Sequence, residues 1–179
     1  RCKLYQIYIL HGNHDGVDPQ TPYFKFLSCF PFIRYINVPT TMEINNRDIL
    51  FLPHSRNPVE EWKDLDLYSP DFILMHGTVS GSVGENGHPL PGGIPKTLFY
   101  GVRGTVLSGD VHVPQKNGPV EYVGSPYPVH FGDTFDPRVV LYLDKKRVGD
   151  IHMPCLHRHA VTVKSVQELE AMTELTPGD

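Results

Sequence analysis

Long apolar runs are absent from this sequence of 179 residues. A helix that spans a membrane needs about 20 consecutive apolar residues, and no stretch of the chain approaches that length. The opening residues, RCKLYQIYIL, are too few and too polar at their flanks to form a signal peptide. We therefore expect neither a membrane partner nor a targeting segment.

Cysteine is scarce, with three residues that lie far apart in the sequence: Cys2, Cys29 and Cys155. An odd number of cysteines without a Cys-x-x-Cys pair indicates neither a disulfide framework nor a zinc knuckle. A reducing compartment, and hence the cytoplasm, is the simplest interpretation.

An excess of positive charge is also missing, because the formal net charge is −4 with histidine neutral. This excludes a generally basic surface that coats phosphates. It leaves nucleic acid open as a substrate, since bound cations can supply positive charge locally. The 40% of hydrophobic residues is enough for one domain with a buried core.

The apolar patterns predict several strands and a few short helices. The strands are expected over 4–10, 32–38, 71–77, 105–112, 138–144 and 159–164, with another starting at 120 and a hairpin over 40–54 that turns at NNRD. Helical segments are expected over 23–30, 57–66 and 165–172, the last with a capping box formed by Ser165 and Glu168. A long Gly- and Pro-rich loop, 78–95, is typical of a functional or mobile segment.

Histidine is abundant, with ten residues, and several of them follow apolar runs. Three predicted strands end in residues of metal-ligand type. Ligands gather beyond the carboxyl ends of strands in α/β sheets, so these three strand ends are expected to converge on one point. These groups are Asn13 and His14 after 4–10, His76 after 71–75, and Asp110 and His112 after 105–108. Imidazole, carboxylate and amide donors together suit Mn, Fe or Zn. Each residue taken alone is also compatible with ordinary turn chemistry.

Four motifs, in this order along the chain, resemble those of the calcineurin-like metallophosphoesterases: GNHD (12–15), MHG (75–77), SGDVH (108–112) and GSPYPVHFGD (124–133). LSGDVHVPQ followed by EYVGSPYPVHF is most similar to the SbcD-type nuclease subunit of DNA repair complexes, and especially to its phage relatives. The resemblance implies an α/β fold, a two-sheet αββα sandwich that here lacks its N-terminal strands and helices. Residues 1–150 would form the C-terminal two-thirds of the catalytic domain. Residues 151–179 would form its last strand and the start of a connection to a cap domain.

The resemblance also implies a site with two metal ions, Mn²⁺ first, with Mg²⁺, Fe²⁺ or Zn²⁺ as options. Asn13, His76 and Asp110 would bind one ion and His112 the other. His14 would face the scissile phosphate, as proton donor or as a stabiliser of the transition state. Ser125 and His88 are candidate substrate contacts, although Ser125 also suits a backbone turn and His88 an exposed loop.

Two departures from the family pattern shape these expectations. Asp110 stands where the family usually has histidine, and we expect this carboxylate to bind metal and to favour Mn²⁺ or Mg²⁺. The Asp-x-His and Gly-Asp-x-x-Asp motifs that supply a bridging carboxylate do not precede GNHD in these residues. Residues 1–179 alone are therefore expected to be inactive or nearly so.

A DNA exonuclease or endonuclease is the first functional expectation. DNA, an SMC-like ATPase subunit and a second copy in a homodimer would be its partners, in the host cytoplasm if a phage encodes the protein. A phosphatase of the same superfamily and a non-catalytic scaffold are the alternatives.

Overall fold

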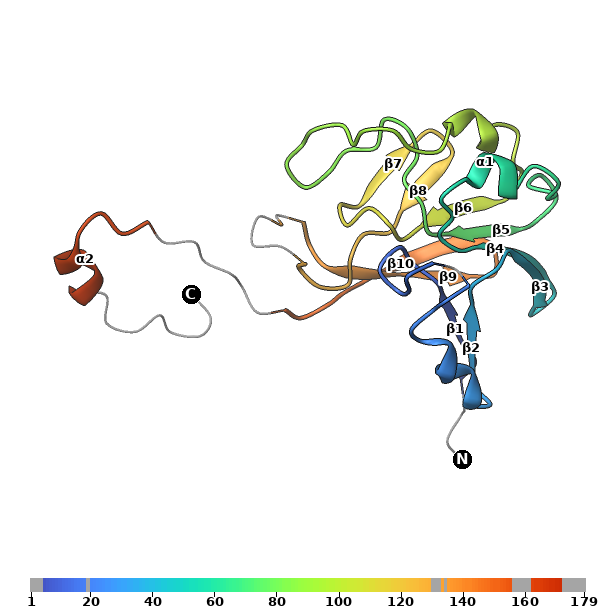
Figure 1. Ribbon diagram of the computed structural model, residues 1–179, viewed down its shortest axis with the longest axis horizontal. Coiled ribbons are helices and arrows are strands. Elements are labelled where there is room, and N and C mark those ends of the chain that lie inside the picture. The colour runs from blue at the N-terminus through green and yellow to red at the C-terminus, as the bar shows by residue number, and fades with distance from the viewer. Residues whose placement is uncertain (1–4, 19, 130–132, 134, 156–161, 172–179) are drawn as a thin grey trace.

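A computed structural model describes residues 5–18, 20–129, 133, 135–155 and 162–171, and it shows a mixed α/β fold with few helices (Figure 1). The largest sheet has six strands in the order β3-β4-β5-β6-β8-β7. Its strands are β3 (Thr40–Ile44), β4 (Arg47–Leu52), β5 (Phe72–Met75), β6 (Thr105–Ser108), β7 (Gln115–Asn117) and β8 (Val120–Tyr122). Strands β4, β5, β6 and β8 are parallel, and β3 and β7 pair antiparallel at the two edges. The sheet is therefore mixed, with a parallel centre.

Two smaller sheets accompany it. Strand β1 (Ile7–Leu10) pairs parallel with β2 (Ile33–Ile36), and β9 (Arg138–Leu143) forms an antiparallel hairpin with β10 (Lys146–His152). The helical elements are the 3-10 helices η1 (Lys25–Cys29) and η2 (Lys96–Phe99), and the short helices α1 (Pro58–Glu61) and α2 (Val166–Ala171). None of the helices in the described part of the chain is long and apolar enough to cross a membrane.

Period-two alternation in the central strands divides their side chains between two faces of the sheet. One face presents Leu50, Ile73 and Val106 to a buried core that includes Trp62 and Phe99. The opposite face turns residues such as Phe72 toward the β9–β10 hairpin, where its ring meets that of Tyr142 edge-on at 5.4 Å. The central strands are apolar on both faces because both are covered.

Most of the predicted strands and the hairpin are confirmed, usually with shorter bounds. The turn of the β3–β4 hairpin places Asn45 and Asn46 at φ values of 53° and 59°, as expected for a two-residue turn that favours asparagine. Ser165 accepts a hydrogen bond from the backbone N–H of Glu168 at 3.1 Å, which confirms the predicted cap of α2.

Two expectations differ from the structure, and two strands were not expected. The predicted helix over 57–66 is one turn long, because only Pro58–Glu61 is helical. Strands β7 and β10 were not predicted, since both are polar and lie at sheet edges. The strand expected over 159–164 falls partly outside the described residues, and Thr162, Val163 and Lys164 are not in a strand.

Candidate metal-binding site

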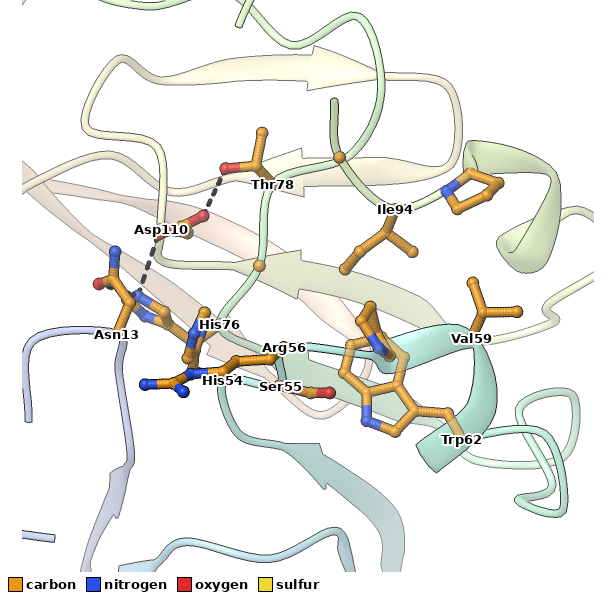
Figure 2. Close-up of a pocket in the computed structure, with 14 residues that line it drawn as sticks. Asn13, His54, Ser55, Arg56, Val59, Trp62, His76, Thr78, Ile94 and Asp110 are labelled. Atoms are coloured by element: carbon orange, nitrogen blue, oxygen red, sulfur yellow. Dashed lines mark hydrogen bonds and ion pairs between the residues drawn. The ribbon is translucent and has the colours of Figure 1, made fainter. Parts of the chain in front are cut away.

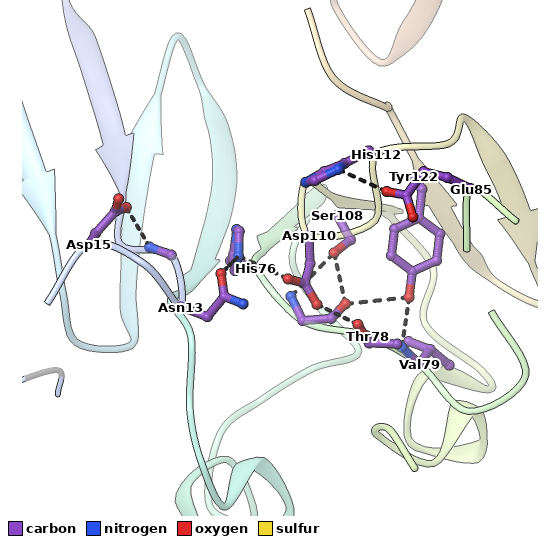
Figure 3. Close-up of polar contacts among 12 residues, drawn as sticks. Asn13, Asp15, His76, Thr78, Val79, Glu85, Ser108, Asp110, His112 and Tyr122 are labelled. Atoms are coloured by element: carbon purple, nitrogen blue, oxygen red, sulfur yellow. Dashed lines mark hydrogen bonds and ion pairs between the residues drawn. The ribbon is translucent and has the colours of Figure 1, made fainter. Parts of the chain in front are cut away.

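The carboxyl ends of β1, β5 and β6 bring three predicted residues together, Asn13, His76 and Asp110 (Figure 3). The Nε2 atom of His76 lies 3.1 Å from Asn13 Oδ1 and 3.1 Å from Asp110 Oδ1. Parallel pairing causes this convergence, because β5 and β6 lie side by side and their ends meet at the same edge of the sheet. We refer to these three residues as the donor cluster.

Two separations among the donor atoms match those between ligands of one ion. Ligands about 2.1 Å from a metal, at angles of 90° to 109°, stand roughly 3.0 to 3.4 Å apart. The distances from His76 Nε2 to Asn13 Oδ1 and to Asp110 Oδ1, both 3.1 Å, fall in this range. Only two of these three residues belong to the types His, Cys, Asp and Glu, and no group of three or more of those types is placed to hold a metal in the described residues. The amide oxygen of Asn13 is the third side-chain donor of this cluster.

Hydrogen bonds fix Asp110 as an acceptor. Its Oδ2 atom accepts a hydrogen bond from Thr78 Oγ1 at 2.5 Å, and its Oδ1 atom faces His76. Burial by itself would raise the pKa of Asp110, but the hydrogen bonds from His76 and Thr78 outweigh burial and hold the pKa below its usual value. Asp110 is consequently ionised at neutral pH and suited to a cation.

Buried hydroxyl groups position the segment that follows His76. Ser108 Oγ donates to the carbonyl oxygen of Gly77 at 2.9 Å, and the hydroxyl of Tyr122 accepts from the backbone N–H of Val79 at 2.7 Å (Figure 3). Ser108 and Tyr122 are each 1% exposed. These bonds satisfy backbone groups that would otherwise be buried without partners, and they hold Thr78 beside Asp110.

Close packing holds the GNHD turn against His76. A Cβ atom added to Gly12 would lie 3.0 Å from the His76 ring, so a side chain there would push the two segments apart. The Gly12 backbone N–H also donates to Asp15 Oδ2 at 2.7 Å. Gly12 and Asp15 of GNHD thus stabilise the turn, and the side chain of Asn13 contacts His76.

The remaining predicted residues lie outside the donor cluster. His112 faces Glu85 of the long loop, with 2.9 Å between His112 Nδ1 and Glu85 Oε1 (Figure 3). His14 is exposed next to Asn13, and His88 is exposed in the loop, where its backbone N–H donates to Asn86 Oδ1. The buried Ser125 uses its hydroxyl to donate to the carbonyl oxygen of Tyr127 at 2.6 Å, which is a turn contact.

A cavity of about 440 Å³ opens beside the donor cluster (Figure 2). Its lining adds residues that were not predicted, among them His54, Arg56 and Trp62. Burial, followed by the neighbouring His76, lowers the pKa of His54, whose ring meets that of His76 edge-on at 6.3 Å. His54 follows an apolar run, ILFLP, and so carried the same signal as His76.

No protein-family model matches this chain, and no curated protein matches it. The resemblance to metallophosphoesterases therefore stays a prediction from the motifs. A function has to be inferred from the donor cluster and the cavity beside it.

Proposed function

We propose that this protein is a metal-dependent phosphodiesterase that acts on DNA. The observation that carries the proposal is the convergence of Asn13 Oδ1, His76 Nε2 and Asp110 Oδ1 at ligand-like separations of 3.1 Å. These atoms come from segments up to 97 positions apart in the sequence, as 110 − 13 = 97. Their meeting beyond the carboxyl ends of strands from two sheets, with one carboxylate held ionised, supports a role in holding a cation.

The donor cluster would hold one divalent cation, with Mn²⁺ preferred because two oxygen donors accompany a single imidazole. When bound, such a cation polarises a phosphoryl oxygen and lowers the pKa of an attacking water. His112, oriented by Glu85, would contribute to a second cation. Mg²⁺, Fe²⁺ and Zn²⁺ are options for the same donors.

His14 would act at the substrate. It follows Asn13 directly and is exposed, so its imidazole is accessible to a phosphodiester at the donor cluster. A histidine there can donate a proton to the leaving oxygen. Ser125 is held in a turn contact and has a positioning role in this proposal, and His88 lies in the loop that borders the site.

The finer identity rests on the motif resemblance. We propose the two-sheet αββα sandwich of metallophosphoesterases, an SbcD-type repair nuclease, an SMC-like ATPase as partner and a homodimer. Coverage of the six-stranded sheet on both faces supports the sandwich. The net charge of −4 supports bound cations, rather than a basic surface, as the source of attraction for DNA.

Metal binding is the first test. Titration of Mn²⁺ into the chain, followed by calorimetry and by the electron paramagnetic resonance signal of free Mn²⁺, should show saturable binding. His76→Ala and Asp110→Ala should each weaken it at least about tenfold, because each removes a direct ligand. His88→Ala, in the exposed loop, is the matched control and should bind as the unchanged chain does. Absence of Mn²⁺ binding would contradict the proposal and favour a non-catalytic scaffold.

Substrate class is the second test. The chain is assayed with Mn²⁺ on a chromogenic phosphodiester, a chromogenic phosphomonoester and linear duplex DNA. We expect cleavage of the two diesters by residues 1–179 to be weak at most, and His14→Ala should remove whatever cleavage is measured while Mn²⁺ binding persists. Preference for the monoester would assign a phosphatase instead, and unchanged diester cleavage in His14→Ala would overturn the role of His14.

A further inference from the structure

A second cavity lies between the large sheet and the β9–β10 hairpin. Its volume is about 390 Å³, which falls within the range of small-molecule sites. In Figure 1 the hairpin lies next to β4 and β5, and the edge-on contact between Phe72 and Tyr142 joins the two layers. No residue of the donor cluster lines this cavity among the described residues. A ligand bound here would therefore be independent of the proposed function.

Apolar side chains form the walls of this cavity. They are the side chains that the strands turn toward the space between the two layers: Ile44, Ile49, Phe72, Leu74, Leu107, Val140 and Tyr142. All of them except Phe72 remain partly exposed, although they lie between two layers. Because protein interiors normally pack such side chains without large voids, the walls lack an apolar partner. Their exposure also means that a ligand can reach them from solvent.

The space suits an aromatic molecule better than water. A buried water needs two to four polar partners, and apolar walls do not offer them. An apolar cavity of about 150 Å³ is already large enough to bind benzene. A cavity of about 390 Å³ therefore has room for a molecule with two or three rings.

Polar groups stand at the end of the cavity where the two hairpin turns meet. Arg47 is the one cation of the described lining and Asp144 the one carboxylate. They neutralise each other, because Arg47 donates from Nε at 2.6 Å, and also from Nη2, to Asp144 Oδ1. Asn45 is exposed beside them, and its carboxamide makes no hydrogen bond within the part of the chain that the structure describes. This end offers a free amide and no unpaired charge.

We propose that this cavity binds an uncharged aromatic molecule of two or three rings that carries one N–H or O–H donor. The rings fill the space between the sheet and the hairpin, and the donor bonds to the side-chain oxygen of Asn45. The bound molecule contacts both layers and holds the hairpin closed against the sheet. The proposal gives the chain a ligand site on the face of the sheet opposite the Leu50 and Ile73 core.

The test uses two probes that share one skeleton. N-phenyl-1-naphthylamine is uncharged and has one N–H, and 8-anilinonaphthalene-1-sulfonate adds a sulfonate to it. Binding of each to the full chain is measured by calorimetry and by the fluorescence of the probe, excited in its own absorption band. We expect saturable binding of the uncharged probe at one site. The sulfonate should bind at least about tenfold more weakly, because its charge would lie without a free cation at apolar walls.

Two neighbouring residues of β9 provide a matched pair of variants. Val140 faces the cavity, and Val139 is 36% exposed on the other side of the same strand. Val140→Trp should weaken binding of the uncharged probe at least about tenfold, because the indole occupies the space in which the probe would bury its rings. Val139→Trp should bind the probe as the unchanged chain does.

The β3–β4 turn provides a second pair that leaves the core intact. Asn45 and Asn46 are both exposed and have φ values of 53° and 59°, which glycine adopts without strain. Asn45→Gly should weaken binding of the uncharged probe about 2- to 10-fold through loss of one hydrogen bond. Asn46→Gly should have no effect, since Asn46 does not line the cavity. This pair tests the site even if Val140→Trp folds poorly.

Hydrogen exchange locates the bound probe. At a free concentration ten times its Kd, the uncharged probe should slow exchange of β9 and β10 amides about tenfold, because opening of the hairpin releases it. Absence of saturable binding, equal affinities in the Val140→Trp and Val139→Trp variants, or unchanged exchange of the hairpin would overturn the site. Equal affinity for the sulfonate would overturn the assignment to an uncharged ligand.

Discussion

Burial controls the protonation of a histidine beneath the GNHD turn. His11 is 1% exposed, and its Nδ1 atom forms a hydrogen bond of 2.7 Å with the hydroxyl of Tyr35. Burial lowers the pKa of His11, although Asp15 opposes this shift. Burial, with the added charge of Asp15, raises the pKa of Tyr35 to about 12. At neutral pH the pair is therefore uncharged, and it anchors the residue that precedes Gly12.

The lowered pKa of His11 predicts a loss of stability in mild acid. Above the unfolded-state pKa of 6.5 the contribution of neutral His11 is fully present. As the pH falls from there through the folded-state pKa, the unfolded chain binds the proton more readily, and the free energy of unfolding decreases. Urea unfolding at pH 7.5 and 5.5 should show a smaller decrease for His11→Gln than for the unchanged chain. His54, whose pKa is also lowered, accounts for a remaining decrease.

The exposed His88 provides the control for that measurement. His88→Gln should show the same pH dependence as the unchanged chain, because the side chain is exposed in the loop. Identical pH dependence in His11→Gln would contradict the burial argument.

At the scale of single residues, the sequence predicted the positions of those site residues that directly follow a strand. Asn13, His76 and Asp110 each follow an apolar run, and that position predicted that they lie together beyond the carboxyl ends of strands, although β1 belongs to a different sheet from β5 and β6. Glu85 and Trp62 carried no such signal. Their positions depend on how the long loop and the segment after α1 fold back over the sheet, which is a matter of tertiary packing. Arg56 was missed for the same reason.

Turns carry the candidate site residues, and the turn after β6 packs closely against the turn after β8. Gly124 has a φ of 83°, and a Cβ atom there would lie 2.5 Å from Pro114 Cγ and 3.0 Å from the carbonyl oxygen of His112. The same oxygen accepts the backbone N–H of Ser125 at 3.0 Å. Gly124 thus allows the SGDVH and GSP turns to pack against each other.

Substitution of Gly124 tests this packing. Gly124→Ala should lower the free energy of unfolding by about 2 to 4 kcal/mol, since a strained φ and a steric clash combine. Gly87→Ala is matched in backbone conformation, with a φ of 76°, but has no atom within 4 Å of the added Cβ. It should cost only about 1 to 2 kcal/mol, from the backbone alone. Urea unfolding of both variants checks the difference, and equal losses would show that the contact with Pro114 is unimportant.

At the scale of elements, regular apolar patterns were predictable and polar edge elements were not. The hairpin over 40–54 was predicted because its turn residues tolerate positive φ. Strand β7 has the sequence QKN and lacks any apolar alternation. It forms because its backbone pairs with β8, and its side chains Gln115 and Asn117 hydrogen bond to the long loop. Such pairing depends on the sheet already being present.

The whole molecule combines a tightly packed face of the large sheet with a loosely packed one. On the tight face the core contains Leu52, Ile73 and Phe99, each exposed by 0%. On the other face a cavity of about 390 Å³ lies between the sheet and the β9–β10 hairpin. Ion pairs between partly exposed groups, such as Lys145 with Asp71 and Arg147 with Glu121, join the hairpin to the sheet. Exposed pairs of this kind contribute little stability.

The hairpin should therefore open before the sheet unfolds, and Tyr142 is the residue that resists opening. Its ring packs against Phe72, which is 7% exposed, and it is the aromatic anchor of the hairpin. Tyr142→Ala removes this contact, which is worth about 2 kcal/mol by the area it buries, so amides of β9 and β10 should exchange about 30-fold faster. Amides of β5 and β6 should keep their protection, since their core lies on the other face. Hydrogen exchange read out by mass spectrometry distinguishes the two regions.

Leu143→Ala is the control for this prediction. Its side chain is 71% exposed, so the substitution should leave the exchange of both regions unchanged. Equal acceleration in β5 and β9 would mean that the hairpin and the sheet unfold as one unit.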